Sequence, residues 1–251
     1  MITIDKLSYS NKMLQNHPLE KVLLSICSLI AVLFSNTYIL PGVVLFSMIM
    51  LIVVKADISW KLLMNFFLIP LVFICTSLIP LLFTFDITGT DGYFLFYELG
   101  FHKALFLFVK SLSSISCFYF LILTTPLEQL DYLMGKLKIS ILFREIMVLI
   151  YRFIFLLTEM VNQIYISQKQ RIGYVSFKGS MRSIALLSSS ILSRSLNHCS
   201  QAHLAVKARG GDSNFIFIES EYDLKLTNLI YISLYFCLLV FVKIGEFLWP
   251  I

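Results

Sequence analysis

VLLSICSLIAVLFSNTYILPGVVLFSMIMLIVV, residues 22–54, is a run of 33 residues that contains no charged side chain. A helix needs about 20 mostly apolar residues to cross the hydrocarbon core of a bilayer, so this run is too long for one untilted helix. Ser35-Asn36-Thr37 and Pro41-Gly42 interrupt it with residues that favour turns. The run therefore predicts two short membrane spans, at about 22–36 and 39–54, that form a hairpin.

The composition of the whole chain indicates the same environment. Hydrophobic residues make up 58% of the 251 residues and charged residues only 14%, against about 45–50% and 25% in soluble domains. The mean hydropathy is +0.85, and further apolar stretches predict spans at 62–84, 103–124 and 226–249. We therefore predict an all-α integral membrane protein with about five transmembrane helices plus a cytoplasmic region of amphipathic helices. A disordered protein, a disulfide scaffold and a nucleic-acid binder are all disfavoured.

Positive charges orient these spans, because cytoplasmic segments carry an excess of lysine and arginine. The lysines that flank the first two spans are Lys6, Lys12, Lys21, Lys55 and Lys61. Residues 85–102 carry no lysine or arginine and are predicted to be external, whereas 126–225 carries 12 of the 20 and is predicted to be cytoplasmic. The predicted organisation is a cytoplasmic N-terminus (1–21), a membrane domain of about four spans (22–125), a cytoplasmic region (126–225) and a C-terminal span (226–251). We expect a multi-pass protein of the cell membrane with its N-terminus inside.

The stretch Phe143–Val161 is apolar enough to resemble a further span. It contains four charged residues, however: Arg144, Glu145, Arg152 and Glu159. A charged side chain at the bilayer centre costs about 2.5–3.5 kcal/mol on insertion scales. We predict that this stretch does not cross and belongs to a long amphipathic helix at about 143–170. Glu145 and Glu159 each lie about two turns from Arg152, so we expect Arg152 to make a structural ion pair or hydrogen bond.

Two more helices are predicted in the cytoplasmic region. A short helix opens at Thr125-Pro126, where Thr125 would cap the helix and Pro126 suits its first turn. Its apolar stripe is Leu127, Leu130, Leu133, Met134 and Leu137, at three- and four-residue spacing. A longer helix is predicted from about Gly179 to Ala208.

The two long helices are predicted to end in the same way. Arg171 is followed by Gly173, and Arg209 by Gly210. Glycine can take the left-handed backbone conformation that stops a helix, and an arginine in the last turn suits the negative end of the helix dipole. A single such pair indicates helix capping alone. Two pairs at the ends of consecutive helices also fit projections offered to a partner protein, and the sequence leaves both interpretations open.

The sequence shows no evident site for catalysis, nucleotide binding or metal binding. No G-x-x-x-x-G-K-[ST] stretch occurs, so we expect no ATP binding through a P-loop. His198 and His203 are five residues apart, which places them on different faces of a helix, and the five cysteines form no C-x-x-C pair. We expect a non-catalytic chain without a metal or cofactor of its own. A membrane-bound enzyme and an adaptor for another soluble partner are the alternatives.

Several motifs, in this order along the chain, resemble those of a known family. They are Ile4-Asp5-Lys6-Leu7-Ser8-Tyr9-Ser10-Asn11 with His17-Pro18-Leu19-Glu20-Lys21, then Leu123-Thr124-Thr125-Pro126, Tyr151-Arg152-Phe153 with Glu159, and the two arginine–glycine helix ends. The second end is complete as Ala205-Val206-Lys207-Ala208-Arg209-Gly210, whereas Gln170-Arg171-Ile172-Gly173 lacks the alanine and inserts an isoleucine. Together these motifs resemble the transmembrane T component of energy-coupling factor (ECF) transporters, most closely its cobalt branch, CbiQ.

The resemblance implies a scaffold subunit of an ECF-type ABC importer. It implies two ABC-type ATPase subunits that bind ATP, and a separate substrate-binding membrane subunit, CbiM-like, with or without a small accessory subunit. The residues implied in coupling to the ATPases are Arg171, Gly173, Ala208, Arg209 and Gly210. Those implied in the structure of the coupling helices are Thr125, Pro126, Tyr151, Arg152 and Glu159. Cobalt is the expected substrate, and the alternatives are nickel, a vitamin, or an adaptor outside the ECF family.

Overall fold

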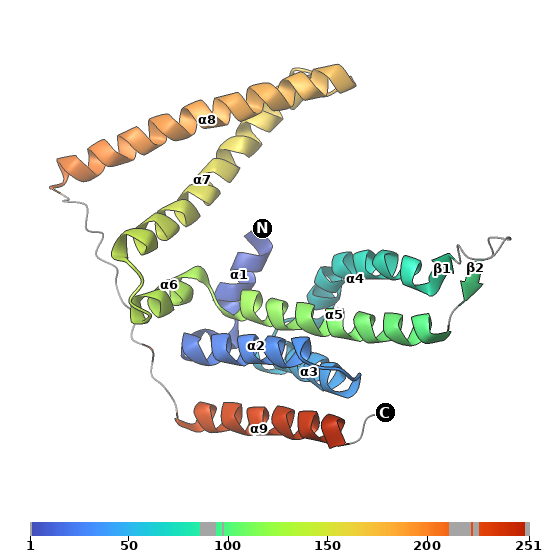
Figure 1. Ribbon diagram of the computed structural model, residues 1–251. Coiled ribbons are helices and arrows are strands. Elements are labelled where there is room, and N and C mark those ends of the chain that lie inside the picture. The colour runs from blue at the N-terminus through green and yellow to red at the C-terminus, as the bar shows by residue number, and fades with distance from the viewer. Residues whose placement is uncertain (1, 86–93, 97, 211–221, 223–225, 249–251) are drawn as a thin grey trace. The chain divides into compact units, whose positions relative to one another are not determined.

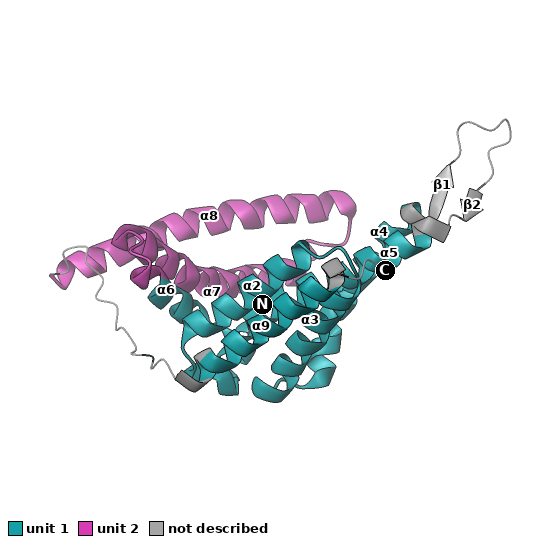
Figure 2. Cartoon of the chain, turned by 60° about the horizontal axis from the view of Figure 1, so that its bottom comes forward, with its two compact units in different colours: residues 1–133, 221–251 teal, residues 134–220 magenta. Residues whose placement is uncertain are grey.

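The chain forms helices joined by turns, with one pair of short strands (Figure 1). The computed structural model describes residues 2–85, 94–96, 98–210, 222 and 226–248. The elements are α1 (Ile2–Ser10), η1 (Lys12–Gln15), α2 (Pro18–Leu33), α3 (Ile39–Met50), η2 (Leu51–Lys55), α4 (Trp60–Leu82), β1 (Phe83–Phe85), β2 (Phe94–Phe96), α5 (Glu98–Thr124), α6 (Leu127–Lys136), α7 (Ile141–Gln170), α8 (Phe177–Ala208) and α9 (Leu226–Leu248). They fall into unit 1 (Met1–Leu133 with Glu221–Ile251) and unit 2 (Met134–Ser220), shown in Figure 2. The division falls within α6, which therefore belongs partly to each unit.

Helix α5 is the centre of unit 1. It contacts α1, α2, α3, α4 and η2, while α9 lies against α2 and α3 (Figure 1). The inner face of α5 carries Ser113, Ser116 and Cys117, which are fully buried. Small side chains let neighbouring helices approach closely. The hydroxyl of Ser25 on α2 donates to the carbonyl O of Cys117 at 2.9 Å and fixes this contact.

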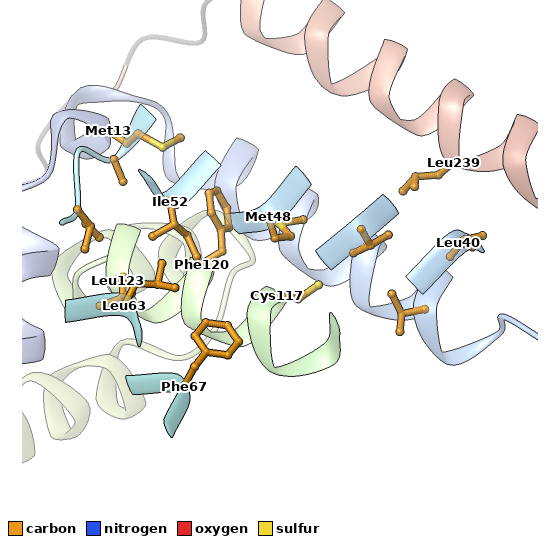
Figure 3. Packing of buried hydrophobic residues seen from close by; sticks show 14 residues of the cluster. Met13, Leu40, Met48, Ile52, Leu63, Phe67, Cys117, Phe120, Leu123 and Leu239 are labelled. Carbon is orange, nitrogen blue, oxygen red and sulfur yellow. The ribbon is translucent and has the colours of Figure 1, made fainter. Parts of the chain in front are cut away.

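An apolar cluster fills the space between these helices (Figure 3). Leu40, Val44, Met48 and Ile52 recur every fourth residue along α3 and η2, and all are 0% exposed. This spacing places them on one face of a continuous helix. The cluster also includes Met13, Leu63, Phe67, Cys117, Phe120, Leu123 and Leu239.

Helix α2 turns its polar side inward. Its buried residues include Lys21, Ser25 and Ser28. Its exposed large apolar residues are Leu23, Ile26, Ile30 and Leu33, with 42–55% of each side chain exposed. A surface helix of a water-soluble domain shows the opposite arrangement, with its apolar stripe toward the core. The pattern of α2 is the one expected where the outer face of a helix meets lipid.

Two lysines cap the ends of α2 and α5, which run antiparallel. Lys21, near the start of α2, donates from Nζ to the carbonyl O of Thr124, the last residue of α5, at 3.0 Å. Lys110 on α5 donates to the carbonyl O of Leu33, the last residue of α2, at 2.9 Å. The last carbonyls of a helix lack partners within the helix and form its negative end, so an ammonium group stabilises them. This arrangement accounts for a lysine inside the predicted span 103–124.

Two helices in the described part of the chain are long and apolar enough to cross a membrane, at Trp60–Pro80 and Phe101–Thr124. Shorter apolar helical stretches occur at Ile39–Lys55 and Ile230–Gly245. A helix is present at each of the five predicted spans. Two of these helices, α4 and α5, contain the stretches that are long and apolar enough to cross a membrane. Helix α7, which contains Phe143–Val161, is not one of the two.

Some local features differ from the sequence predictions. Pro41-Gly42 lies in the first turn of α3 rather than in the preceding turn, because a proline there sacrifices no helical hydrogen bond. Helix α1, which was not predicted, packs against α5. Strands β1 and β2 pair antiparallel, with Phe83 opposite Phe96. Half of the predicted external loop 85–102, residues 86–93 and 97, lies outside the described residues.

Unit 2 is built on α7 and α8, which meet at the turn joining them and diverge from it in Figure 1. Among the described residues from 134 to 210, only Arg144, Met160 and Ser183 are buried. Many apolar side chains are therefore left uncovered, with Phe177 82% and Val175 78% exposed. Helices with so much uncovered apolar surface are typical of an interface with another molecule.

Candidate functional site

The N-terminal motif and the threonine–proline motif meet in a buried polar junction of unit 1. Its centre is Lys21, which is 2% exposed. Besides Thr124, its Nζ donates to Oε1 of Gln129 in the first turn of α6 at 2.9 Å. Gln129 is 0% exposed and donates from Nε2 to the carbonyl O of Leu14 at 2.7 Å. These bonds join η1, α2, the end of α5 and the start of α6.

His17 brings aromatic side chains to the same junction. It caps α2, with Nδ1 accepting a hydrogen bond from the backbone N–H of Leu19 at 3.1 Å. Its ring packs edge-on against Tyr132 of α6 and Tyr222, with centroids 5.8 and 6.5 Å away. The buried His17 thus contacts α6 and the residue that precedes α9 in the described chain.

Several polar atoms of the junction are buried without a hydrogen-bond partner, namely Oδ1 of Asn11, Oε1 of Glu20 and Oγ1 of Thr125. The other carboxylate oxygen of Glu20 accepts from Nδ2 of Asn228 on α9 at 3.0 Å. Burial lowers the pKa of Lys21 from 10.5 to about 8, against an opposing effect of the Glu20 carboxylate. Lys21 directly precedes the predicted span 22–36. Burying its charge costs free energy, and its hydrogen bonds offset this cost.

The turn between α7 and α8 holds Arg171, at which α7 ends. Gln168 bridges the turn: its Nε2 donates to the carbonyl O of Ser183 at 3.1 Å, and its Oε1 accepts from the Tyr174 hydroxyl at 2.7 Å. The Ser183 hydroxyl donates to the carbonyl O of Gly173 at 2.8 Å. These bonds cross the turn, so the backbone of Arg171 lies in a fixed frame while its side chain is exposed.

The predicted role of Gly173 in stopping α7 was wrong. Ile172 takes the left-handed conformation instead, with φ at 61°. A Cβ on Gly173 would lie 2.7 Å from Oγ of Ser183 and 2.9 Å from the carbonyl O of Gln168. Gly173 is therefore required because α8 approaches the turn closely, and the inserted Ile172 carries the backbone strain.

Replacing Ile172 by asparagine is expected to stabilise the protein by about 1 kcal/mol, because a left-handed conformation costs a non-glycine residue about 1–2 kcal/mol and asparagine tolerates it best. The Ile172 side chain is 72% exposed, so little burial is lost. Thermal unfolding of the purified protein should show a rise of a few degrees. Val175→Asn is the matched control, since Val175 is 78% exposed and lies outside the residues with positive φ. Equal shifts in both variants would contradict the assignment.

Arg209 ends α8, and backbone bonds define this end. Its N–H donates to the carbonyl O of Val206 at 3.1 Å, and that of Gly210 donates to Lys207 at 3.0 Å. Gly210 has φ at 72°, as predicted. Ala208, the last residue of α8, and Arg209 are both exposed. Because α8 has 32 residues, it is about 48 Å long at 1.5 Å per residue. Arg171 lies in the turn before it, and Arg209 directly follows its last residue.

The buried arginine of α7 is Arg144 rather than Arg152. Arg152 and Glu159 are exposed, and Arg152 forms no ion pair with another described residue, so the expected pair is absent. Arg144 is 7% exposed and lies over α6, where a Cβ on Gly135 would be 2.6 Å from its Nη1. Tyr151 is half-buried and packs edge-on against the phenylalanine four residues later, at 4.9 Å between centroids.

The start of α6 also differs from the prediction. Thr125 does not cap the helix, because its buried hydroxyl has no hydrogen-bond partner. The carbonyl O of Pro126, also buried, accepts from the backbone N–H of Gln129 at 3.1 Å. Leu137 of the predicted stripe lies beyond the helix and is 74% exposed. The buried residues of α6 are Gln129, Asp131 and Leu133, since the junction offers polar partners.

Sequence reasoning missed this junction. It used Lys21 to orient the first span and as the last residue of the N-terminal motif, and it did not consider Gln129 or Asn228. One signal was available, because Lys21, Ser25 and Ser28 follow one another at four and three residues and so define a polar helix face within an apolar run.

Comparison with known proteins places the chain in a family. Residues 10–216 match the family model CbiQ, described as cobalt transport protein. The chain is similar to the uncharacterized protein MJ1089 of Methanocaldococcus jannaschii, with 26% identity over 241 residues, 92% of this chain and 89% of that protein. It is also similar to a putative fused cobalt transport protein, CbiMQ, of Methanocorpusculum labreanum, with 26% identity over 229 residues, 87% of this chain and 38% of that protein. The chain therefore belongs to the CbiQ family of cobalt transport proteins.

Proposed function

We propose that this chain is the transmembrane scaffold subunit of an ECF-type ABC importer that takes up a transition-metal ion, cobalt. Two cytoplasmic ABC-type ATPase subunits bind and hydrolyse ATP, and a separate CbiM-like membrane subunit binds the metal. This chain transmits motion between them and holds neither ATP nor metal. Membership of the CbiQ family supports the assignment, and the name of the fused CbiMQ relative supports a CbiM-type partner.

The observation that carries the proposal is the pair of exposed arginines that end α7 and α8. A guanidinium group presents a planar fork that can bind a carboxylate with two hydrogen bonds and stays charged when desolvated. Two such groups, separated by the whole of α8, which is about 48 Å long, suit two copies of an ATPase subunit. Around Arg171, the side chains of Ile172, Val175 and Phe177 are 72–82% exposed. An arginine surrounded by uncovered apolar residues is typical of the centre of an interface.

The buried junction supplies a route for the coupling motion. Lys21 and Gln129 hold the first turn of α6 to α2, η1 and the end of α5. Helix α6 then leads directly to Arg144, which lies over Gly135 at the start of unit 2. A movement of the helix ends that bind the ATPases therefore reaches the membrane unit through α6.

The membrane arrangement of the proposal is five spans, in α2, α3 with η2, α4, α5 and α9. The N-terminus is inside, and the described part of 126–225 is cytoplasmic. The apolar outer faces of these helices support it: Ile69 and Phe73 of α4 are both 76% exposed, and Phe241 of α9 is 78% exposed. Covering such apolar side chains with lipid lowers the free energy of the protein.

Cysteine labelling tests this topology. We expect Ser140→Cys and Val175→Cys to react with a membrane-impermeant maleimide only after the cells are opened, because α7 does not cross the membrane. Val175 is preferred to Ser176, whose hydroxyl caps α8 by accepting from Gly179 N–H at 3.1 Å. Asn36→Cys, exposed between α2 and α3, should react in intact cells. All variants are made in a background without the five native cysteines. Labelling of Val175→Cys in intact cells would refute the topology.

The function is tested by purifying the tagged chain from its native membrane. Co-purification of P-loop ATPases and a second membrane protein, together with ATP-dependent uptake of radioactive cobalt by the reconstituted complex, is the expected result. Uptake of nickel or a vitamin in place of cobalt would change the substrate but keep the scaffold role. Recovery of a different soluble partner without ATPases would make the chain an adaptor and end the proposal.

A further inference from the structure

A cavity of about 200 Å³ lies in unit 1 between α2, η2 and α9. Its polar lining includes Glu20, Lys21, Lys55 and Asn228, and Leu24 and Leu51 are among its apolar residues. Lys21 directs two of its three Nζ donors to Thr124 and Gln129. The other charged groups of the lining are the Glu20 carboxylate and the Lys55 ammonium.

The Glu20 carboxylate is only half satisfied. The residue is 4% exposed. Its Oε2 accepts from Asn228, while Oε1 is buried and has no hydrogen-bond partner. A buried carboxylate oxygen without a donor is strongly unfavourable, because it has lost water and gained nothing in return. A hydrogen-bond donor inside the cavity would therefore stabilise the Glu20 carboxylate, and a positively charged donor would do so most strongly.

Lys55 provides the opposite charge in the lining of the cavity. It is the last residue of η2, its side chain is exposed, and its Nζ lies 5.6 Å from the ring centroid of Tyr231, which also lines the cavity. With Glu20, Lys21 and Lys55 together, the lining carries one more positive than negative charge. A simple cation would meet two ammonium groups here, whereas a ligand with both an ammonium and an anionic group finds a partner for each.

An apolar groove of about 590 Å³ adjoins the cavity at Ile232, which lines both. On α9 the groove is lined by Ile232, Phe236, Val240 and Ile244, four residues apart, and on α2 by Leu23. From Ile232 to Ile244 the groove follows α9 for about 18 Å at 1.5 Å per residue. This is just over half of the roughly 30 Å hydrocarbon core, the depth that one leaflet occupies.

We propose that the cavity and the groove bind one phospholipid with a phosphoethanolamine headgroup. The primary ammonium donates to Oε1 of Glu20, the phosphate pairs with Lys55, and one hydrocarbon chain lies along α9. A primary ammonium has N–H donors for Glu20, whereas a trimethylated choline has none. This inference rests on the membrane placement proposed above, in which the start of α2, the end of η2 and the start of α9 lie at the same membrane face.

The test uses the full chain purified in detergent, without ATPases, and exposed to equal amounts of phosphatidylethanolamine, phosphatidylglycerol and phosphatidylcholine. Native mass spectrometry counts the lipids retained per chain. We expect about one retained lipid and an enrichment of phosphatidylethanolamine by about tenfold, the factor that corresponds to 1.4 kcal/mol. The N-methylated series from phosphatidylethanolamine to phosphatidylcholine should lose retention once the last N–H is removed. This series needs no variant, so it decides the question even if a substitution disturbs folding.

Glu20→Gln and Lys55→Gln should each remove most of the enrichment. Asp57→Asn and Lys61→Gln are the matched controls, because these residues carry the same charges near η2 and do not line the cavity. Equal retention of all three lipids, or enrichment that survives Glu20→Gln in a folded variant, would overturn the proposal. Lipid retention and ATPase binding are measured separately, so a chain that selects the lipid without binding ATPases refutes the proposed function alone, and the reverse result refutes this inference alone.

Discussion

A variant with both Arg171→Ala and Arg209→Ala is expected to lose its ATPase subunits during purification and to show no ATP-driven cobalt uptake. If each arginine fills a groove on one ATPase, its truncation leaves the partner carboxylate buried and unpaired. Such a loss costs about 2–5 kcal/mol. At 1.4 kcal/mol per decade this is on the order of 30-fold to several thousand-fold in affinity at each site. Single variants should therefore be partly active, because one of the two docking sites is kept.

The matched control is a variant with Arg182→Ala and Arg194→Ala. Both arginines are exposed on α8, one in its second turn and one in its second half, so this variant loses the same charge but neither docking group. It should keep its ATPases and transport normally.

Helix capping alone predicts a different result for Arg209→Lys. Lysine stabilises a helix C-terminus nearly as well as arginine, but it lacks the planar fork. Poor rescue by Arg209→Lys would support docking, and full rescue would support capping. A double alanine variant that still holds its ATPases and transports would end the coupling hypothesis.

The sequence predicted the long helices well because apolar runs and apolar periodicity are strong signals. The stretches at 62–84, 103–124 and 143–170 correspond to α4, α5 and α7. Helix α1 was missed because Ile2–Ser10 has no sustained apolar face. Its packing depends on α5, and Asn11 at its end donates to the carbonyl O of Leu123 at 3.0 Å. Such a contact between residues 112 positions apart cannot be seen in local periodicity.

The site was predicted in part. Arg171 and Arg209 end their helices as expected, since an arginine near a glycine is a local signal. The sequence could not show that Ile172 rather than Gly173 takes the left-handed conformation, because that depends on how closely Ser183 approaches the turn. It also selected Arg152 over Arg144, because it could not show that Gly135 of α6 leaves room for the Arg144 side chain.

Replacing Lys21 by methionine is expected to destabilise the protein by about 2–4 kcal/mol. Methionine fills much of the same space, so the loss is one of hydrogen bonding rather than packing. It leaves two buried acceptors, the carbonyl O of Thr124 and Oε1 of Gln129, without their donor. Each unsatisfied acceptor costs about 1–3 kcal/mol, and relief from burying the ammonium group offsets part of the sum. Lys61→Met, at an exposed lysine, is the matched control and should change the stability little.

A double-mutant cycle with Gln129→Leu tests whether the cost comes from this junction. The Gln129 acceptor is absent from the double variant. Its loss of stability should therefore be smaller than the sum of the two single variants' losses of stability, by about 0.5–3 kcal/mol. The pH dependence gives a second measurement. Since the pKa of Lys21 falls from 10.5 to about 8 on folding, the unfolded chain binds the proton more tightly, and the stability conferred by this site should rise with pH between those values. Lys21→Met should lack that rise. If the cycle is additive and the two pH profiles are parallel, Lys21 does not hold α6 to the membrane unit, and the coupling motion must pass by another route.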